Sequence, residues 1–309
     1  MSRPFPVWIR RPWGSGEDFG FTKDLLGDLR LTTVCQSARC PNRGECWARR
    51  TATFMILGNV CTRDCRFCAV RHGKPDPVDQ EEAQRVAEAV KRLRVRHAVV
   101  TSVTRDDLPD GGAAHFAATV RAIRAVNPHA TVEVLVPDFD ADPQAIACVL
   151  GARPDVLGHN IETVDRLYAE LRGADHSYTR ALDVLWTAHA QSPETLIKSA
   201  FMLGHGETKE EVLRTLRDLL DAGCVAVCMG QYLQPTPQQV DVTAFVPPEQ
   251  FEAYEDEARR LGFRAVWAAP FVRSSYRSGE LLDALRGSQR STWASTRTAR
   301  CEMPLLLRE

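Results

Sequence analysis

The sequence feature that most constrains this chain is a group of three cysteines directly after a short apolar run. Residues 53–57 read TFMIL, which is typical of a buried β-strand. Cys61, Cys65 and Cys68, here called the downstream triplet, follow at CxxxCxxC spacing on a loop that leaves this strand. A structural zinc ion or a fully protein-ligated Fe4S4 cluster takes four protein ligands. Three close thiolates therefore predict an Fe4S4 cube with one iron left open to a small molecule.

Two readings of the downstream triplet compete. A Cys3His zinc site would recruit His72, but zinc motifs usually combine a CxxC pair with a distant second pair. The CxxxCxxC loop is instead typical of the radical S-adenosylmethionine (SAM) superfamily, in which the open iron chelates the amino and carboxylate groups of SAM. Phe67, between the last two cysteines, is expected to shield the cluster from water.

A second group of cysteines precedes the first. Cys35, Cys40 and Cys46, the upstream triplet, have CxxxxCxxxxxC spacing, and Pro41 and Gly44 bend the chain between them. One such group alone is compatible with buried structural thiols, but two in succession are not easily explained in that way. We expect a second cluster that again lacks a fourth cysteine.

Composition limits the remaining classes. The chain has 309 residues, 44% of them hydrophobic and 26% charged, as expected for a globular protein with one large α/β domain or two smaller ones. A net charge of −1 predicts no general attraction to nucleic acid or to membranes. The first residues show no signal-peptide core, and no apolar run approaches the roughly 20 residues that span a bilayer.

Cysteine usage indicates the compartment. Six of the ten cysteines crowd into residues 35–68, whereas Cys148, Cys224, Cys228 and Cys301 are scattered. This distribution favours metal binding over disulfides, and it predicts a reducing, cytoplasmic location. Cys148, Cys224 and Cys228 fall at apolar positions, where we expect buried thiols.

Short β-branched runs alternate with helical stretches from residue 51 onward. The predicted strands are 53–57, 97–102, 132–136, 156–161, 197–203 and 226–231, with a short strand near 264–268. The predicted helices are 79–94, 112–126, 141–150, 163–172, 180–191, 208–222 and 248–261. Thr208 and Glu211 form a capping-box pattern at the start of one of them. Six βα units predict either a partial barrel or an open doubly wound sheet.

Polar motifs follow each predicted strand, which favours the barrel. The carboxyl ends of parallel strands form the site in such folds, so one mouth would gather these motifs. We therefore predict an α/β fold with a partial parallel (β/α)6 barrel over residues 51–270. Residues 1–50 form an N-terminal extension whose first 34 residues are an arm over the domain, and residues 271–309 form a C-terminal segment and tail. Both extensions are expected to cover the barrel mouth.

The motifs together resemble one family, the lipoyl synthases, from about residue 30 to residue 277. The similarity rests on CPNRGEC at 40–46, TATFMILGNVCTRDCRFCAV at 51–70, TSVTRDDLPDGG at 101–112, HNIETVDRLY at 159–168, GQYLQP at 230–235 and RSSY at 273–276. CxxxCxxC alone would indicate only the radical SAM superfamily. The upstream triplet and the RSSY motif make the resemblance specific.

This resemblance implies a division of labour. The downstream triplet would hold the catalytic cluster that cleaves SAM to a 5′-deoxyadenosyl radical, which takes hydrogen from C6 and C8 of an octanoyl chain on a lysine of a lipoyl carrier protein or domain. The upstream triplet would hold an auxiliary Fe4S4 cluster that serves as the sulfur source, with Ser275 as its fourth ligand. Such chemistry suits an unactivated methylene, which offers nothing to acid–base or nucleophilic catalysis.

The resemblance also implies the cofactors and partners. They are two 4Fe-4S clusters, SAM, a low-potential electron donor such as ferredoxin or flavodoxin, and an iron–sulfur carrier that rebuilds the auxiliary cluster. Neither a nucleic acid nor a membrane is expected as a partner. The alternatives are a divergent radical SAM sulfurtransferase with another acyl or carrier substrate, and a non-catalytic iron–sulfur carrier.

Several further residues are candidates for contacts with SAM or substrate. Asn160 and Glu162 are expected to bond the ribose or amino group, and Lys198 to meet a carboxylate. Gly204 and Gly206 would permit close backbone approach. The alternative for this set is a group of satisfied polar residues and a turn at strand ends. Arg273 would either make a structural ion pair or position the carrier's lysine arm.

Overall fold

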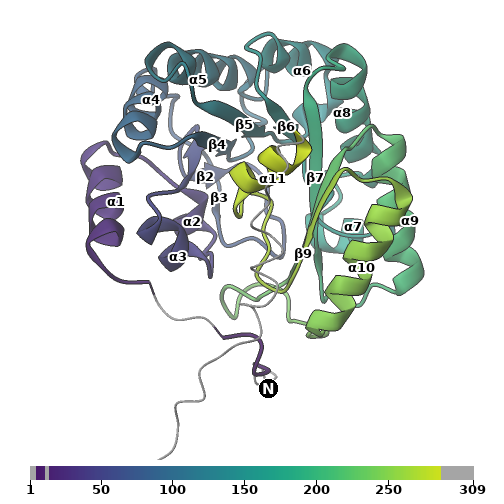
Figure 1. Ribbon diagram of the computed structural model, residues 1–309. Helices are drawn as coiled ribbons and strands as arrows, with labels where there is room; N and C mark the ends of the chain where they lie inside the picture. Colours follow the sequence, from purple (N-terminus) through teal and green to yellow (C-terminus); the bar gives the residue numbers. More distant parts are fainter. Residues whose placement is uncertain (1–4, 11–13, 287–309) are drawn as a thin grey trace, which may run out of the picture.

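A seven-stranded parallel sheet forms the centre of the molecule (Figure 1). The computed structural model describes residues 5–10 and 14–286, so Cys301 and the rest of the C-terminal tail lie outside the described residues. The strands are β1 (Thr53–Ile56), β4 (His97–Ser102), β5 (Thr131–Leu135), β6 (Val156–Gly158), β7 (Leu196–Leu203), β8 (Ala226–Gln231) and β9 (Ala265–Ala268). They stand in the sheet in the same order as in the chain. A doubly wound sheet reverses its strand order, so the partial barrel is the correct alternative.

Helices follow the strands and cover the outside of the sheet (Figure 1). Those of the barrel are α4 (Glu82–Leu93), α5 (Ala113–Val126), α6 (Pro143–Leu150), α7 (Asp165–Arg172), α8 (Tyr178–Gln191), α9 (Lys209–Asp221) and α10 (Pro248–Leu261). A short 3-10 turn, η1 (Phe139–Ala141), precedes α6, and β2 (Val60–Cys61) pairs with β3 (Arg71–His72) outside the main sheet. No helix in the described part of the chain is both long and apolar enough to cross a bilayer.

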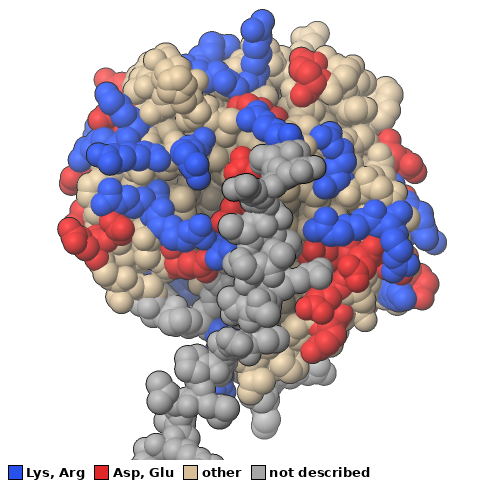
Figure 2. All heavy atoms as spheres, in the orientation of Figure 1, with Lys and Arg blue, Asp and Glu red and all other residues tan. Residues whose placement is uncertain are grey.

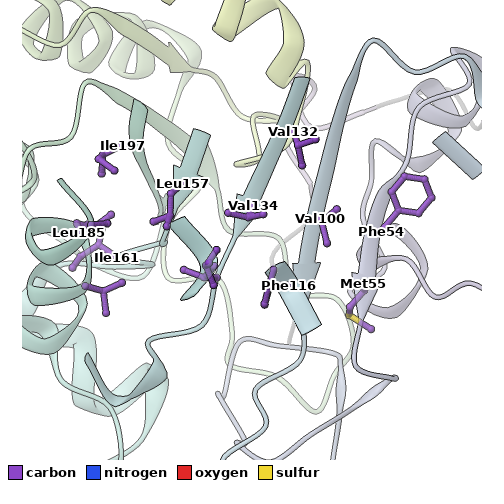
Figure 3. Packing of buried hydrophobic residues seen from close by; sticks show 14 of the residues in the cluster. Phe54, Met55, Val100, Phe116, Val132, Val134, Leu157, Ile161, Leu185 and Ile197 are labelled. Carbon is purple, nitrogen blue, oxygen red and sulfur yellow. The ribbon is translucent and has the colours of Figure 1, made fainter. Parts of the chain in front are cut away.

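The core lies between the sheet and these helices. Figure 3 shows side chains of neighbouring strands, such as Val100, Val134 and Leu157, close to Phe116 of α5 and Leu185 of α8. All six residues of β8 are buried, as expected for a parallel strand covered on both faces. At the start of α9 the predicted capping box is confirmed, because Thr208 and Glu211 bond each other's backbone N–H groups.

Two segments differ from the predicted elements. Residues 1–34 were expected to lie over the domain as an arm and no helix was predicted there, but they contain α1 (Glu17–Asp28), with Leu25 and Leu26 fully buried. The strand predicted at 156–161 ends at Gly158, because the chain leaves the sheet before Glu162, whose φ is 64°. The division into segments at residues 50 and 271 stays a prediction, although one hydrophobic cluster extends from Leu25 to Ala268.

The last described helix, α11 (Ser278–Leu285), lies at the centre of the barrel in Figure 1. Leu281 and Leu285 pack against Ala226 of β8 and Ala265 of β9, the first residues of their strands. Because α11 contacts both β9 and β4, it spans the sheet near the amino ends of the strands.

Candidate functional site

A cavity of about 1010 Å³ runs through the barrel. Its wall includes both ends of β4, since His97 and Ser102 line it. Most of the predicted site residues line this one cavity, namely Cys35, Cys40, Cys46, Cys61, Cys65, Cys68, Asn160, Glu162, Arg273 and Ser275. Lys198, Gly204 and Gly206 are not part of its wall.

The downstream triplet lies on a loop whose backbone faces the sulfurs. Arg63 N–H and Thr104 N–H donate to the Cys61 Sγ at 3.5 and 3.3 Å, and Val70 N–H donates to the Cys68 Sγ at 3.4 Å. The parallel pairing of β2 with β3 closes the loop around them. Hydrogen bonds from fixed N–H groups favour the negative thiolate over the thiol.

Burial opposes that charge. It raises the pKa of Cys68 to about 12, although the hydrogen bond from the Val70 N–H acts to lower it. It raises the pKa of Cys65 to about 11, although the charge of the Arg172 guanidinium acts to lower it. Thiols in this setting become thiolates when a metal ion supplies positive charge. The donor set is soft, convergent and weakly solvated, so it fits an iron–sulfur cluster.

The arrangement does not suit a single metal ion. Among the described residues, no three His, Cys, Asp or Glu side chains are close enough to bind one ion. His72 is exposed and faces the Asp64 carboxylate at 3.1 Å, so the Cys3His zinc reading has no support. Separate thiolates that each bind a different iron of a cluster do not need to meet at one point.

Behind Cys65 lies a polar group that the sequence analysis missed. The guanidinium groups of Arg63 and Arg172 donate to His176 Nδ1 at 3.0 and 3.1 Å. The His176 proton is thus expected on Nε2, which lies 3.5 Å from the Cys65 Sγ. Arg63 is also paired with Asp138 at 2.7 Å. Arg63 could have been noticed inside CxxxCxxC, but no motif signals His176.

Three polar side chains face the cavity beyond β6. The Asn160 Nδ2 donates to Glu162 Oε1 at 3.1 Å, and Glu162 has a left-handed backbone with φ 64°. Burial raises the pKa of Glu162 despite Arg172. His159 donates from Nδ1 to Val136 O at 2.9 Å, and its buried Nε2 has no hydrogen-bond partner in the described structure. That nitrogen is an acceptor suited to a ligand hydroxyl or amino group.

Gly204 and Gly206 lie in a turn packed by the protein itself. Gly204 has φ 110°, and a Cβ there would stand 2.1 Å from Gln231 Nε2 and 2.6 Å from Ala244 O. Gly206 has φ 97° and faces Thr243. Close approach is therefore required at Gly204, but the approaching groups belong to the chain. A ligand contact for these two glycines stays a prediction.

Lys198 is buried on β7, apart from the cavity wall. Its Nζ donates to Glu133 Oε1 at 2.6 Å and to Ser278 Oγ at 2.8 Å. The carboxylate that it meets belongs to the protein, so binding a cofactor carboxylate would require this pair to break.

The upstream triplet spans two short helices, α2 (Val34–Ser37) and α3 (Arg43–Ala48), with Cys40 in the turn between them. Cys35 is buried in α2, and burial, followed by the charge of Cys40, raises its pKa to about 11. As in the other triplet, a metal is needed to hold this sulfur as a thiolate. Cys46 lies in α3 and is partly exposed.

Side chains tie the RSSY segment to the upstream triplet. The Asn42 Nδ2 donates to Phe271 O at 2.7 Å, and the Tyr276 hydroxyl donates to Glu45 at 3.0 Å. Arg277 also pairs with Glu45, at 3.1 Å. Chain positions more than 200 residues apart are therefore joined around one end of the cavity.

Ser275 and Arg273 are fixed within this segment. The Ser275 Oγ accepts a hydrogen bond of 2.8 Å from the Thr53 Oγ1 at the start of β1. The Arg273 Nη1 donates to Val272 O at 2.6 Å. The segment crosses β8 at Gly230, where a Cβ would stand 2.0 Å from Val272 O. A glycine is therefore required for the RSSY backbone to approach the strand.

The remaining cysteines divide in two. Cys224 and Cys228 are buried, as predicted, and burial raises the pKa of Cys228 to about 11. Cys148 is exposed, so the prediction of a buried thiol was wrong there. It lies in α6 on the side that faces away from the core residues Ile146 and Val149.

Comparisons with known proteins match most of the chain. Residues 55–219 match the model of the Radical SAM superfamily. The chain is 52% identical to lipoyl synthase of Caldanaerobacter subterraneus over 282 residues, which cover 91% of this chain and 98% of the relative. It is 50% identical to lipoyl synthase of Thermus thermophilus over 291 residues, which cover 94% and 90% of the two chains.

Solved structures share the fold at low sequence identity. Methylornithine synthase matches with a TM-score of 0.54 at 17% identity, over 79% of this chain and 74% of that one. The [FeFe]-hydrogenase maturase HydG matches with a TM-score of 0.57 at 14% identity, over 75% and 53%.

Proposed function

The chain belongs to the lipoyl synthase family of radical SAM enzymes, which insert sulfur at C6 and C8 of an octanoyl chain on a lipoyl carrier, and we propose that its two cysteine triplets divide this work. The family implies a 4Fe-4S cluster and SAM. Our proposal assigns the catalytic cluster to the downstream triplet. It assigns a second, sulfur-donating cluster to the upstream triplet together with Ser275.

The observation that carries this proposal is that both triplets and Ser275 line a single cavity. The contacts of Glu45 and Asn42 with the RSSY segment support an oxygen ligand beside the upstream triplet, because they hold Ser275 near it. A serine oxygen is a harder donor than a thiolate and is less well matched to iron. Such a ligand would leave its iron more readily than a cysteine when the cluster gives up sulfide.

The chain's own residues would bind and orient the cofactor and substrate. When bound, SAM and its cluster supply a carbon-centred radical, which an unactivated methylene requires. We assign Asn160, Glu162 and the free Nε2 of His159 to hydrogen bonds with SAM, since they face the cavity near the downstream triplet's loop. The acyl chain would lie along apolar wall residues such as Leu135, Phe201 and Met202, which keep water away from it.

The substrate is a lipoyl carrier, which a protein surface must receive. Figure 2 shows Lys and Arg side chains spread over the face that carries α11, with acidic side chains among them. Arg39, Arg94 and Arg96 are exposed cavity-lining residues without an ion pair among the described residues. We propose that they contact the carrier, that a ferredoxin or flavodoxin supplies electrons, and that an iron–sulfur carrier rebuilds the second cluster.

The division of labour is tested with two single variants. We predict that Cys68→Ala abolishes formation of 5′-deoxyadenosine, because one ligand of the SAM cluster is lost. Cys40→Ala should still form 5′-deoxyadenosine with dithionite but add no sulfur to an octanoyl-lysyl peptide. Both products are measured by mass spectrometry. Equal loss of both activities in both variants would contradict the assignment.

Two simpler measurements separate the other candidates. About eight iron and eight sulfide ions per chain are expected after anaerobic purification, because each cube holds four of each. A count of four iron and four sulfide ions per chain would contradict the proposal of a second cluster. A divergent sulfurtransferase would form 5′-deoxyadenosine but leave the octanoyl peptide unchanged, and a carrier protein would form neither product.

A further inference from the structure

A buried polar network lies beneath α11, apart from the cofactor site described above. Lys198 of β7 and Glu133 of β5 are each 2% exposed, and Ser278, the first residue of α11, is 4% exposed. His97 of β4 contacts the same carboxylate, with its Nε2 3.2 Å from Glu133 Oε2. Three strands and one helix therefore meet at Glu133.

The directions of these hydrogen bonds follow from the donors available. The Lys198 ammonium can only donate, and it donates to Glu133 Oε1 at 2.6 Å and to Ser278 Oγ at 2.8 Å. The ionised carboxylate can only accept, so the Ser278 hydroxyl donates to Glu133 Oε2. Lys198, Glu133 and Ser278 thus form a closed ring of hydrogen bonds. In it the Ser278 hydroxyl donates to Glu133 and accepts from Lys198. This ring fixes the start of α11 to two strands.

Stability alone does not explain a buried charge pair at this position. Removing two charges from water costs several kcal/mol per ion, and apolar residues of similar volume are often equally or more stable. A buried pair does enforce a unique arrangement, because a displaced partner leaves the other charge unpaired. The presence of this buried ring is therefore better explained by a role in positioning a neighbouring residue.

The neighbour that it positions is Ser275. Ser278 is three residues after Ser275, and Arg277 between them has a left-handed backbone with φ 50°, so the turn is tight. Gly279 fits against β4, since a Cβ there would stand 3.2 Å from the His97 Cβ. A shift of Ser278 would thus carry Ser275 away from Thr53.

We propose that Lys198 and Glu133 are positioning residues that hold α11 so that the Ser275 hydroxyl faces the upstream triplet. The inference rests on the proposed function, in which Ser275 completes the second cluster. It gives Lys198 a role in place of the expected contact with a cofactor carboxylate. Ser275, three residues before α11, would then be held beside the upstream triplet by a helix that stays fixed.

The test uses full-length protein in which the downstream triplet is replaced by alanines, so that only the second cluster is present. The double variant Lys198→Met/Glu133→Gln removes the charges together and avoids an unpaired buried ion. We expect its Mössbauer spectrum to lose the distinct oxygen-ligated iron site. We also expect iron loss to a chelator to be faster by a factor on the order of ten, the effect of about 1.4 kcal/mol.

A matched control separates positioning from general destabilisation. His115 and Glu82 form another buried pair, 2.9 Å apart, between α5 and α4 on the outside of the sheet. The variant His115→Phe/Glu82→Gln should lower the unfolding midpoint without changing the Mössbauer spectrum. If the two double variants change the spectrum equally, the positioning role is wrong.

Two more variants keep the outcomes distinguishable. Ser275→Ala must itself remove the oxygen-ligated site; if it does not, the proposed function fails, whatever Lys198 does. If Ser275→Ala removes the site but Lys198→Met/Glu133→Gln retains it, the positioning inference alone fails. Should the double variant not fold, Ser278→Ala removes only the hydroxyl link and must weaken the same spectral site. An unchanged spectrum in Ser278→Ala would then overturn the proposal.

Discussion

At the scale of single residues, the environment of Cys65 differs from those of its two partners. Cys61 and Cys68 accept backbone N–H groups, whereas Cys65 faces an imidazole oriented by two guanidinium groups. Backbone donors are fixed by the loop and accompany the motif. The imidazole of His176 comes from a segment 111 residues away, so its effect can be varied by substitution.

We predict that His176→Ala lowers the reduction potential of the downstream cluster, because an N–H···S hydrogen bond stabilises the more negative reduced state. A hydrogen bond to a charged group contributes about 1.5 kcal/mol or more, and a tenfold change for one electron is about 59 mV. A redox titration followed by electron paramagnetic resonance measures the shift. His176→Gln, which keeps an N–H donor, should recover part of it. His72→Ala, at an exposed histidine near the same loop, should cause none.

The cysteines and Lys198 show which site residues a sequence can reveal. Both triplets could be predicted because their spacing brings the thiols together within one loop or helix pair. The partner of Lys198 is Glu133, 65 residues earlier, and nothing near Lys198 in the sequence indicates that contact. Ser275 was suggested by family resemblance, since an isolated serine carries no spacing signal.

At the scale of elements, the sequence predicted a helix end where neighbouring residues cap that helix. The capping box of α9 was predicted because Thr208 and Glu211 are three residues apart and contact each other. The helix α1 was missed because its apolar residues are few and Gly20 and Gly27 interrupt them. Its stability depends on tertiary contacts such as the Thr22 hydroxyl donating to Trp47 O at 2.9 Å.

Thr208→Ala is expected to lower the free energy of unfolding by about 1 kcal/mol, the usual effect of losing an N-cap side chain. Urea denaturation followed by circular dichroism measures it. Thr208→Ser keeps the hydroxyl and should stay within a few tenths of a kcal/mol of the parent protein. The iron content should be unchanged in both variants, since α9 does not line the cavity.

Gly230→Ala should displace the RSSY segment, because its Cβ would overlap the backbone oxygen of Val272 at 2.0 Å. We expect this variant to lose iron from the second cluster while it still forms 5′-deoxyadenosine. Gly27→Ala is the control: no atom lies within 4 Å of its Cβ, and alanine favours the helix. An intact second cluster in Gly230→Ala would show that the segment does not need this approach.

At the scale of the whole molecule, the alternating pattern predicted a parallel sheet, and the polar motifs after the strands favoured the barrel over the doubly wound order. Each βα unit packs on the one before it, so β1 and then β4 to β9 stand in the sheet in the order of the chain. The helix α11 contacts β9 and β4, and its place depends on Ser278 and the Glu133 network. Such long-range contacts leave no periodic pattern.

The same network predicts how stability depends on pH. Burial opposes the charge of Glu133, but Lys198 and His97 outweigh it and lower the pKa from 4.5 to about 2. A lowered carboxyl pKa stabilises the folded protein above its unfolded value, and this stability is lost as the pH falls from about 4.5 toward 2.

Urea unfolding of iron-free protein between about pH 5 and pH 3 measures this decline. Lys198→Met/Glu133→Gln should decline less steeply than the parent, because the titrating carboxylate is gone. Parallel curves for the two proteins would assign acid sensitivity to other groups.

The cavity that joins the two cysteine triplets has a consequence for how turnover is confined. A short-lived carbon species formed beside one triplet would meet the other within the same cavity, since both triplets line it. Reaction with the second triplet would then compete less with loss of this species to solvent. The second sulfur insertion would then need only a shift of the lysine-linked acyl chain by two carbons. The chain would not have to leave the cavity between the two insertions.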